Sequence, residues 1–224
     1  MLLKAKDISF GYSKNKIILN RVNFEIDAGE RVALIGPSGC GKSTLSQILA
    51  GYLAPSSGEV LLDGKPLPDK GFCPVQLIYQ HPEKAVNPRW KMQKTLNEAW
   101  TPDDAFLSEI GIEKQWLNRY PGELSGGELQ RFCVARALGP QTQFIIADEM
   151  STMLDVITQA QIWELMLNII QKRGLGLLVV THSPELAERI CTRVVRFEEI
   201  AGLNYKLMDT TMPRNKLQRY CGQQ

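Results

Sequence analysis

The sequence predicts an α/β fold with a parallel β-sheet and crossover helices, an N-terminal antiparallel β subdomain, and a helical subdomain in the middle of the chain. Three observations support this prediction. Short alternating apolar segments occupy the N-terminal part, and buried strand patterns alternate with an amphipathic helix pattern towards the C-terminus. Strand patterns are absent from residues 80–138.

The N-terminal elements follow from residue alternation. The segments "ISFGY" and "VNFEI" alternate along the chain and are rich in β-branched and aromatic residues, which is typical of antiparallel strands. The segment "GERVALIG" predicts a turn and a buried strand, and "KSTLSQILAGYL" has the apolar spacing of a helix. The segment "GEVLLDGKPL" predicts a hairpin with an Asp-Gly turn.

The rest of the chain divides into a helical part and a strand–helix–strand part. In residues 80–138, prolines separate short helical patterns, which predicts the helical subdomain. After it, "QFIIADE" and "LGLLVVTH" are buried strand patterns, and an amphipathic helix between them ends at Gly174. This alternation indicates a parallel sheet. Residues 212–224 are expected to form a loose tail.

Composition limits the classes of function. The 224 residues are 44% hydrophobic, which is enough for a compact core, and the net charge of +2 gives no general reason to expect nucleic acid as a partner. The five cysteines are scattered without a CxxC pair, so they indicate a reduced, cytosolic compartment rather than zinc or disulfides. No apolar run is long enough to span a bilayer, so any service to a membrane is expected to act through a partner.

The segment "GPSGCGKST" matches the phosphate-loop pattern G-x-x-x-x-G-K-[ST] and lies between a predicted strand and a predicted helix, which is the context that the pattern needs. Backbone N–H groups at the helix start form a positive concavity for phosphate. Lys42 is expected to bridge the β- and γ-phosphates of ATP, and the Ser43 hydroxyl to ligate Mg²⁺. The residues of this loop expected to bind ATP are Gly36, Pro37, Ser38, Gly39, Cys40, Gly41, Lys42, Ser43 and Thr44.

Acidic residues end one buried strand pattern, and a histidine ends the next. Asp148 is expected to hold Mg²⁺, and Glu149 to polarise the attacking water as a general base. The alternative, a pair of acids that caps the following turn, is less favoured beside a phosphate loop. His182 is expected to contact the γ-phosphate. For Tyr12, stacking on adenine and a purely structural role both stay open.

The segment "LSGGELQR" resembles a second anion-binding helix start. Ser125 can cap the helix, Glu128 lies one turn inside it, and Gly126 and Gly127 let a ligand approach the backbone. The alternative is an ordinary N-cap turn, which needs the serine but not the two glycines. A chain with two phosphate-binding helix starts requires an explanation.

Taken in order, "GPSGCGKST", "LSGGELQR", "FIIADE", "STMLD" and "VVTH" resemble the motifs of the ATP-binding cassette (ABC) ATPases over almost the whole chain. The resemblance implies a P-loop NTPase (RecA-like) core with an N-terminal antiparallel β subdomain and a helical signature subdomain. Residues 1–224 would form one cassette. The catalytic core with the β subdomain would comprise residues 1–79 and 139–224, and the signature subdomain residues 80–138.

The resemblance also assigns residues and partners. Gln80 would be the Q-loop residue, which binds ATP and Mg²⁺, Asp155 the D-loop aspartate, and Tyr12 the ring that stacks on adenine. In this family two cassettes, identical or different, dimerise head to tail around two ATP molecules. The signature residues Ser125, Gly126, Gly127 and Glu128 would therefore serve the partner's ATP, which explains the second helix start.

A further likeness narrows the expected role. The segment "QHPEKAVNPRW" resembles the Q-loop region of ATPases that serve peptide and nickel importers, and "DEMSTMLD" lacks the proline that usually follows the glutamate. This implies an ATPase subunit that powers import of nickel, metal chelates or peptides. It would bind transmembrane permease subunits peripherally on the cytoplasmic side of the inner membrane, together with an extracytoplasmic solute-binding protein. The alternative, a soluble ABC ATPase acting on ribosomes or DNA, usually has tandem cassettes or a coiled-coil insert.

Overall fold

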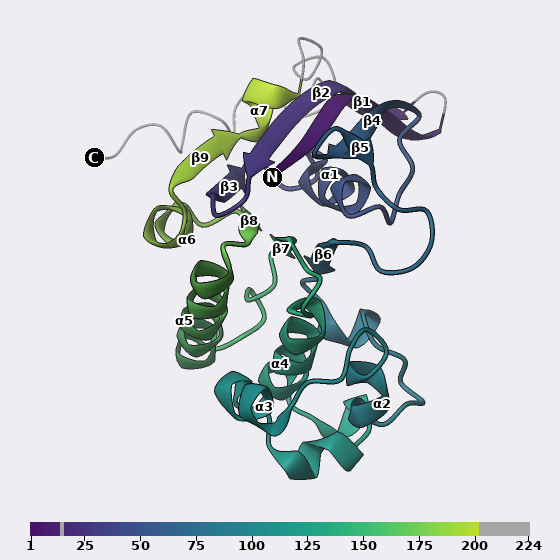
Figure 1. Ribbon diagram of the computed structural model, residues 1–224. Helices are drawn as coiled ribbons and strands as arrows, with labels where there is room; N and C mark the ends of the chain where they lie inside the picture. Colours follow the sequence, from purple (N-terminus) through teal and green to yellow (C-terminus); the bar gives the residue numbers. More distant parts are fainter. Residues whose placement is uncertain (14–15, 202–224) are drawn as a thin grey trace, which may run out of the picture.

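Two β-sheets with a helix between them lie above a lobe of short helices in the computed structural model (Figure 1). The structure describes residues 1–13 and 16–201. The tail expected for residues 212–224 lies outside the described residues.

The N-terminal sheet is antiparallel, as predicted, and its strand order is β2-β1-β4-β5. Strand β1 buries Leu3 and Ala5 and then Ile8 and Phe10, so the buried positions change from odd to even numbers. The register shifts at this point, and Asp7 has a φ of 50°. This β-bulge keeps the apolar side chains on the inner face over a strand of 12 residues. The strands of this sheet are β1 (Leu2–Ser13), β2 (Lys16–Asp27), β4 (Ser57–Leu62) and β5 (Lys65–Pro66).

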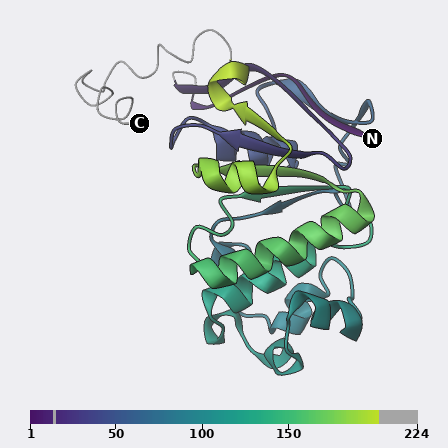
Figure 2. The same cartoon turned by 90° about the vertical axis from the view of Figure 1, so that its left-hand side faces the viewer.

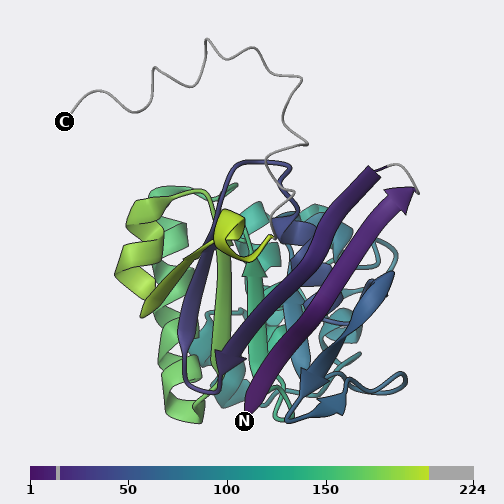
Figure 3. The same ribbon diagram turned by 90° about the horizontal axis from the view of Figure 1, so that it is seen from above.

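The core sheet is parallel throughout, in the order β6-β7-β8-β3-β9. In β7, Phe144 and Ile146 pack into the cluster that contains α1 (Lys42–Leu49) and the antiparallel sheet. Ile145 and Ala147 pack into the cluster that contains α4 (Gly126–Ala137) and α5 (Val156–Arg173). Both faces of the sheet are therefore covered, which is normal for parallel sheets. Figure 3 shows β1 and β2 crossing over these strands. The strands are β3 (Arg31–Ile35), β6 (Val75–Ile78), β7 (Phe144–Asp148), β8 (Gly176–Thr181) and β9 (Arg193–Arg196).

All regular structure described in residues 80–138 is helical, as the proline-punctuated sequence predicts. Trp116 and Phe132 of this lobe are buried in one hydrophobic cluster with Trp163 of α5 and residues of β7 and β8. The lobe thus shares its core with the parallel sheet, and α5 runs across the boundary between them (Figure 2). The helices of the lobe are η1 (Pro82–Lys84), α2 (Met92–Leu96), α3 (Asp104–Ile110), η2 (Lys114–Asn118), η3 (Pro121–Glu123) and α4 (Gly126–Ala137).

The remaining helices cover the parallel sheet. Helix α1 packs Leu45, Ile48 and Leu49 into the space between the two sheets. Helix α5 ends at Gly174, as predicted, where a left-handed conformation with a φ of 64° terminates it. Their bounds are α1 (Lys42–Leu49), α5 (Val156–Arg173), α6 (Pro184–Ile190) and α7 (Phe197–Ile200). None of the helices in the described part of the chain is long and apolar enough to cross a membrane.

Candidate nucleotide-binding site

The turn between β3 and α1 is shaped by glycines. Gly41 has a φ of 113°, and a Cβ atom at this position would lie 2.9 Å from Cγ2 of Ile18, so the position requires glycine. A Cβ atom at Gly36 would lie 3.0 Å from Cβ of Phe197. The backbone can therefore turn sharply against its neighbours before α1 begins at Lys42.

Lys42 is buried, and its ammonium group lies over this loop. The Nζ atom donates hydrogen bonds to the backbone oxygens of Gly36 at 2.8 Å and Pro37 at 2.9 Å. The Sγ atom of Cys40, which is also buried, lies 3.9 Å from Nζ. A lysine in this position can bind an anion as a charge-assisted donor. Of the other loop residues, Ser38, Gly39 and Ser43 are exposed and Thr44 is buried in the first turn of α1.

Helix α1 begins without a side-chain cap. Its N-cap residue is Gly41, which has no side chain to accept a hydrogen bond, and its first turn contains no acidic residue. The first N–H groups of any α-helix lack intrahelical acceptors, and the helix dipole makes this end positive. The start of α1 therefore has the chemistry of an anion site, and the buried Lys42 adds a full charge to it.

The parallel sheet brings the end of β7 next to α1. The Ser43 hydroxyl donates a hydrogen bond to Oδ1 of Asp148 at 3.1 Å. Burial raises the pKa of Asp148 above its ordinary value, although the bond from Ser43 opposes this effect. A hydroxyl and a carboxylate oxygen side by side are hard ligands of the kind that Mg²⁺ prefers. The residues at this point fit such an ion.

Glu149 follows Asp148 and has an unusual backbone. Its φ is 48°, in the left-handed region that non-glycine residues rarely adopt, and its N–H donates to the oxygen of Val180 on the neighbouring strand at 3.0 Å. Its Oε1 atom lies 3.4 Å from Nδ1 of His182, whose side chain is 60% exposed. The structure thus brings the expected general base and the expected γ-phosphate contact together at the ends of β7 and β8.

Gln80 lies two residues beyond the end of β6, the neighbour of β7, and its side chain reaches the same turn. Its Nε2 atom donates to Oγ1 of Thr152 at 2.9 Å, and Oγ1 of Thr152 donates to the backbone oxygen of Glu149 at 3.0 Å. The sequence motifs predicted no role for Thr152, although the segment "STMLD" contains it, because only Asp155 of that segment was given a function. A hydroxyl three residues beyond a strand-end glutamate, in a turn facing the Q-loop, was the available signal.

Tyr12 lies at the end of β1, on the side of the phosphate loop. Its exposed ring packs edge to face on Phe10 at a centroid distance of 5.0 Å. Phe10 pairs with Leu19, and a Cβ atom at Gly41 would lie 3.1 Å from Leu19. An exposed ring near the loop is available for stacking, as expected of an adenine-binding residue, and adenine stacking stays a prediction.

The signature segment is separate from this cluster. Ser125 caps α4, and the predicted capping box is present: its Oγ accepts from the N–H of Glu128 at 3.3 Å, while Glu128 Oε2 accepts from the N–H of Ser125 at 2.6 Å. No hydrogen bond in the described part of the chain joins this segment to the phosphate loop. A Cβ atom at Gly127 would lie 2.8 Å from Cγ2 of Thr158, whereas Gly126 faces open space. A side chain at position 127 would therefore force Thr158 to move, so Gly127 also serves helix packing, which the sequence motif did not indicate.

Asp155 caps α5, next to the start of α4. Its Oδ1 atom accepts from the N–H groups of Ile157 at 3.1 Å and Thr158 at 3.0 Å. The bond from Thr158 and then that from Ile157 hold the pKa of the Asp155 carboxyl below its ordinary value. The structure thus gives the expected D-loop residue a capping function at the helix that supports the signature segment.

A glycine loop with a buried lysine, a serine–aspartate pair at the sheet edge and a capped glycine helix start together define a P-loop ATPase with a signature helix. The profile of the family described as ABC transporter matches residues 19–152. The chain belongs to this ATP-binding cassette family. It is an ATPase subunit that powers solute transport by a membrane ABC transporter, and ATP is its nucleotide.

Several relatives are similar over most of the chain. The nickel import ATP-binding protein NikE of Escherichia coli is 32% identical, over 96% of this chain and 89% of that protein. The nickel import system ATP-binding protein NikE of Staphylococcus aureus is 34% identical, over 87% of this chain and 85% of that one. These matches extend the likeness to importer ATPases well beyond the short motifs.

Solved structures show the same fold. The cassette MJ0796, a dimer in a post-hydrolysis state bound to ADP and Pi, superposes with a TM-score of 0.72 at 26% identity, covering 87% of this chain and 93% of that one. The cbiO1 protein of Clostridium perfringens, part of the transporter complex cbiONQ, gives a TM-score of 0.71 at 25% identity, covering 87% and 83%. The α/β fold with an antiparallel subdomain and a helical lobe is thus the fold of ABC cassettes, as the sequence predicted.

Proposed function

We propose that this chain is the ATP-hydrolysing subunit of an importer for nickel, metal chelates or peptides. The observation that carries the site assignment is the hydrogen bond between Ser43 and Asp148, which joins the phosphate loop to the acidic strand end. The solute class is supported by the nickel-import function named for both relatives above.

The catalytic roles follow from the cluster at the sheet edge. Lys42 and the N–H groups at the start of α1 bind the phosphates of ATP, and Ser43, Asp148 and Gln80 would hold Mg²⁺. When bound, this ion supplies positive charge to the β- and γ-phosphate oxygens. Glu149 accepts a proton from the attacking water, and His182 contacts the γ-phosphate from the neighbouring strand end.

The signature segment serves the ATP of a second cassette. Ser125 and Gly126 are exposed, so the start of α4 is accessible to another chain. Support comes from the cassette MJ0796, which is a dimer. The partner cassette, identical or different, would supply its phosphate loop to this helix start, while Tyr12 stacks on the adenine held by this chain. The cassette comprises residues 1–224, with the signature subdomain at residues 80–138.

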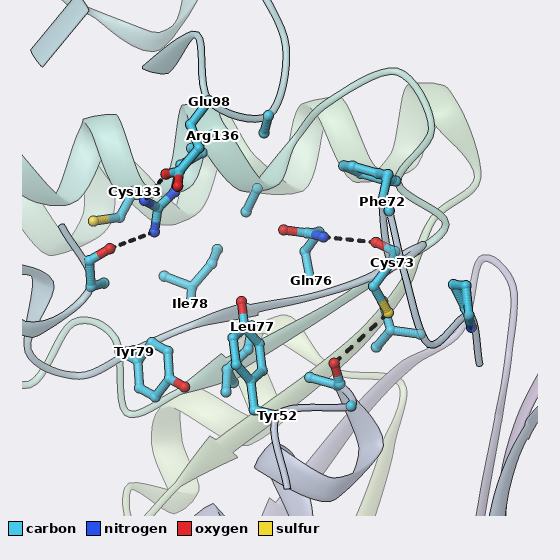
Figure 4. Close-up of a pocket in the computed structure, with 18 of the residues that line it drawn as sticks. Tyr52, Phe72, Cys73, Gln76, Leu77, Ile78, Tyr79, Glu98, Cys133 and Arg136 are labelled. Carbon is cyan, nitrogen blue, oxygen red and sulfur yellow. Dashed lines mark hydrogen bonds and ion pairs between the residues drawn. The ribbon is translucent and has the colours of Figure 1, made fainter. Parts of the chain in front are cut away.

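The permease subunits would dock where the helical lobe meets the core. A hollow of about 740 Å³ lies at the junction of the lobe and the core, with Tyr52 and Tyr79 on the core side and Arg136 and Glu98 on the lobe side (Figure 4). Arg136 is fixed by bonds to the oxygen of Ala85 at 2.8 Å and to Glu98 at 3.4 Å. A hollow of this kind can receive a short helix of a membrane subunit. This docking would hold the cassette peripherally on the cytoplasmic side of the inner membrane, with a solute-binding protein outside.

Crosslinking in the assembled transporter tests this docking. A photo-crosslinking residue at Asn87, exposed on the lobe, should capture a permease subunit, whereas one at Val194, exposed on β9, should not. The complex in liposomes should take up radioactive nickel only with ATP, and Lys42→Ala should stop uptake. Capture from Val194 but not from Asn87 would refute the docking face. Uptake of peptides but not of nickel would narrow the proposed solutes to peptides.

A further inference from the structure

Two hydroxyl groups fix the turn that follows β7. Ser151 is buried, and its Oγ accepts hydrogen bonds from Nε2 of Gln159 at 2.9 Å and Nε1 of Trp163 at 3.0 Å. These bonds anchor the turn to α5. Thr152 is exposed and faces the other way, towards Gln80 of the Q-loop. The turn therefore has one buried attachment and one attachment that solvent and ligand can reach.

The hydroxyl of Thr152 fixes the orientation of the Gln80 amide. A threonine hydroxyl has a single proton to donate, and the backbone oxygen of Glu149, 3.0 Å away, can only accept it. Oγ1 must therefore act as the acceptor towards Gln80, and the amide must present its Nε2 atom, which lies at 2.9 Å. Among the described residues no hydrogen bond reaches the amide oxygen of Gln80, so this oxygen is available to another donor or to a cation.

Thr152 also holds Glu149. The backbone oxygen of Glu149 receives the N–H of Thr152 at 3.2 Å as well as its hydroxyl at 3.0 Å. Because Glu149 has a φ of 48°, its backbone conformation needs support from its surroundings. One residue thus links the Q-loop amide to the backbone of the glutamate expected to be the general base.

We infer that Thr152 is a positioning residue. It keeps the oxygen of the Gln80 amide available for Mg²⁺ and transmits the position of Gln80 to Glu149. This inference rests on the proposed function, in which Gln80 is a ligand of Mg²⁺. Movement of Gln80 would then shift the backbone of Glu149 through the two hydrogen bonds of Thr152. The buried hydrogen bonds of Ser151 would stay unchanged.

The test uses the full chain and three threonine variants. Thr152→Val removes the hydroxyl with little change of shape, and Thr152→Ser retains it. Thr101→Val makes the same chemical change at an exposed residue of the helical lobe. Each is measured for the affinity of a fluorescent ATP analogue with and without Mg²⁺, for the Mg²⁺ concentration that gives half-maximal ATPase, and for kcat and KM.

Thr152→Val should raise the half-maximal Mg²⁺ concentration and lower kcat by roughly 2- to 10-fold each, the scale of one lost hydrogen bond. Affinity for the analogue without Mg²⁺ should not change, since the contacts of the phosphate loop are intact. Thr152→Ser should restore the parent values, and Thr101→Val should match the parent. In a Gln80→Ala background, Thr152→Val should leave the Mg²⁺ requirement unchanged, because it acts there through Gln80.

The outcomes separate this inference from the proposed function. If Gln80→Ala does not change the Mg²⁺ requirement, the proposed role of Gln80 is wrong and the inference fails with it. If Gln80→Ala changes the requirement but Thr152→Val does not, or if their effects add, only the inference is overturned. Equal loss in Thr152→Ser and Thr152→Val would also overturn it, because the hydroxyl would then not be the active group.

Discussion

Helices α1 and α4 both begin at glycine-rich turns, but their first N–H groups are treated differently. Helix α1 has no side-chain cap and no acid in its first turn. Helix α4 is closed by Ser125 and Glu128, which satisfy each other's backbone N–H groups. The first start depends on a buried lysine of its own chain for charge, whereas the second already carries an anionic side chain.

In the proposed function, one chain contributes halves of two different sites, and this difference between the two helix starts supports that arrangement. The start of α1 lies beside polar groups at the ends of β3, β6, β7 and β8, and the proposed nucleotide chemistry is placed there. The start of α4 is exposed and is held in shape by its own capping box. If the start of α4 binds the ATP of a partner chain, as proposed, it must keep its conformation when that ATP is absent.

The largest expected effect concerns hydrolysis at the α1 half. Glu149→Gln keeps the shape of the side chain but removes the base, so kcat should fall roughly 10²–10⁴-fold while ATP still binds. The matched change in the α4 half, Glu128→Gln, preserves a capping box and should have a far smaller effect on kcat. Single-turnover hydrolysis of both variants measures the contrast. If Glu149→Gln hydrolyses ATP at the parent rate, Glu149 is not the general base, and Asp148 must be considered for that role.

Nucleotide affinity should depend on α1 alone in the isolated chain. Lys42→Ala removes a charged donor to the phosphates and should weaken ATP binding roughly 10- to 100-fold. Ser125→Arg should leave this affinity unchanged, because its bulk lies at α4. Equilibrium binding of a labelled ATP analogue distinguishes the two variants. An equal loss of ATP affinity in the two variants would mean that both helix starts belong to one site in one chain.

Pairing the two lesions tests whether α4 acts on the partner. In a tandem fusion of two copies, Lys42→Ala in one copy and Ser125→Arg in the other should fall on the same composite site and leave the second site intact. Both lesions in one copy should damage both sites. Nucleotide trapping measures assembly, since hydrolysis in such complexes can require both sites. Identical trapping in the two arrangements would exclude action in trans.

A smaller effect is expected on stability. Ser125→Ala removes the side-chain cap of α4 and should lower the free energy of unfolding by about 1 kcal/mol, whereas Ser125→Gly should lower it by only a few tenths. Urea unfolding followed by circular dichroism measures both. No loss in Ser125→Ala would show that the capping box does not stabilise the start of α4.

The smallest effect is a pH dependence at Asp155, the cap of the neighbouring helix α5. Because hydrogen bonds lower the pKa of its carboxyl, the charged form stabilises the fold above the unfolded-state pKa of about 3.9. This contribution is lost as the pH falls through the lower pKa of the folded state. The melting temperature of Asp155→Asn should therefore lie slightly below that of the parent at neutral pH and converge with it in strong acid. A constant difference would contradict the charge-based cap.

Sequence patterns predicted the elements that are long or carry motifs. Strands β3, β7 and β8 were recognisable because each is buried on both faces and joins a motif. The patterns missed β6 and β9, which have four residues each and are too short for alternation to be distinctive. Helices α6 and α7 were missed as well, and only seven and four residues form them. These elements acquire their structure from contacts with the sheet.

The candidate site was predictable to the extent that local motifs carry it. The residue types at the phosphate loop, β7 and β8 indicated the chemistry, but their relative positions depend on sheet order. Gln80 and Thr152 are 72 residues apart and meet only because β6 and β7 are neighbours. The contact of Gly127 with Thr158 likewise depends on how α4 packs on α5.

That contact has an evolutionary consequence. A Cβ atom at position 127 would lie 2.8 Å from Cγ2 of Thr158, so a side chain at position 127 requires Thr158 to move or to be replaced by a smaller residue. Among descendants of this chain, the two positions should covary, and a small residue at position 158 should precede any replacement of Gly127. The second glycine of the signature segment is thus constrained by the packing of two helices, in addition to its proposed role towards the partner's nucleotide.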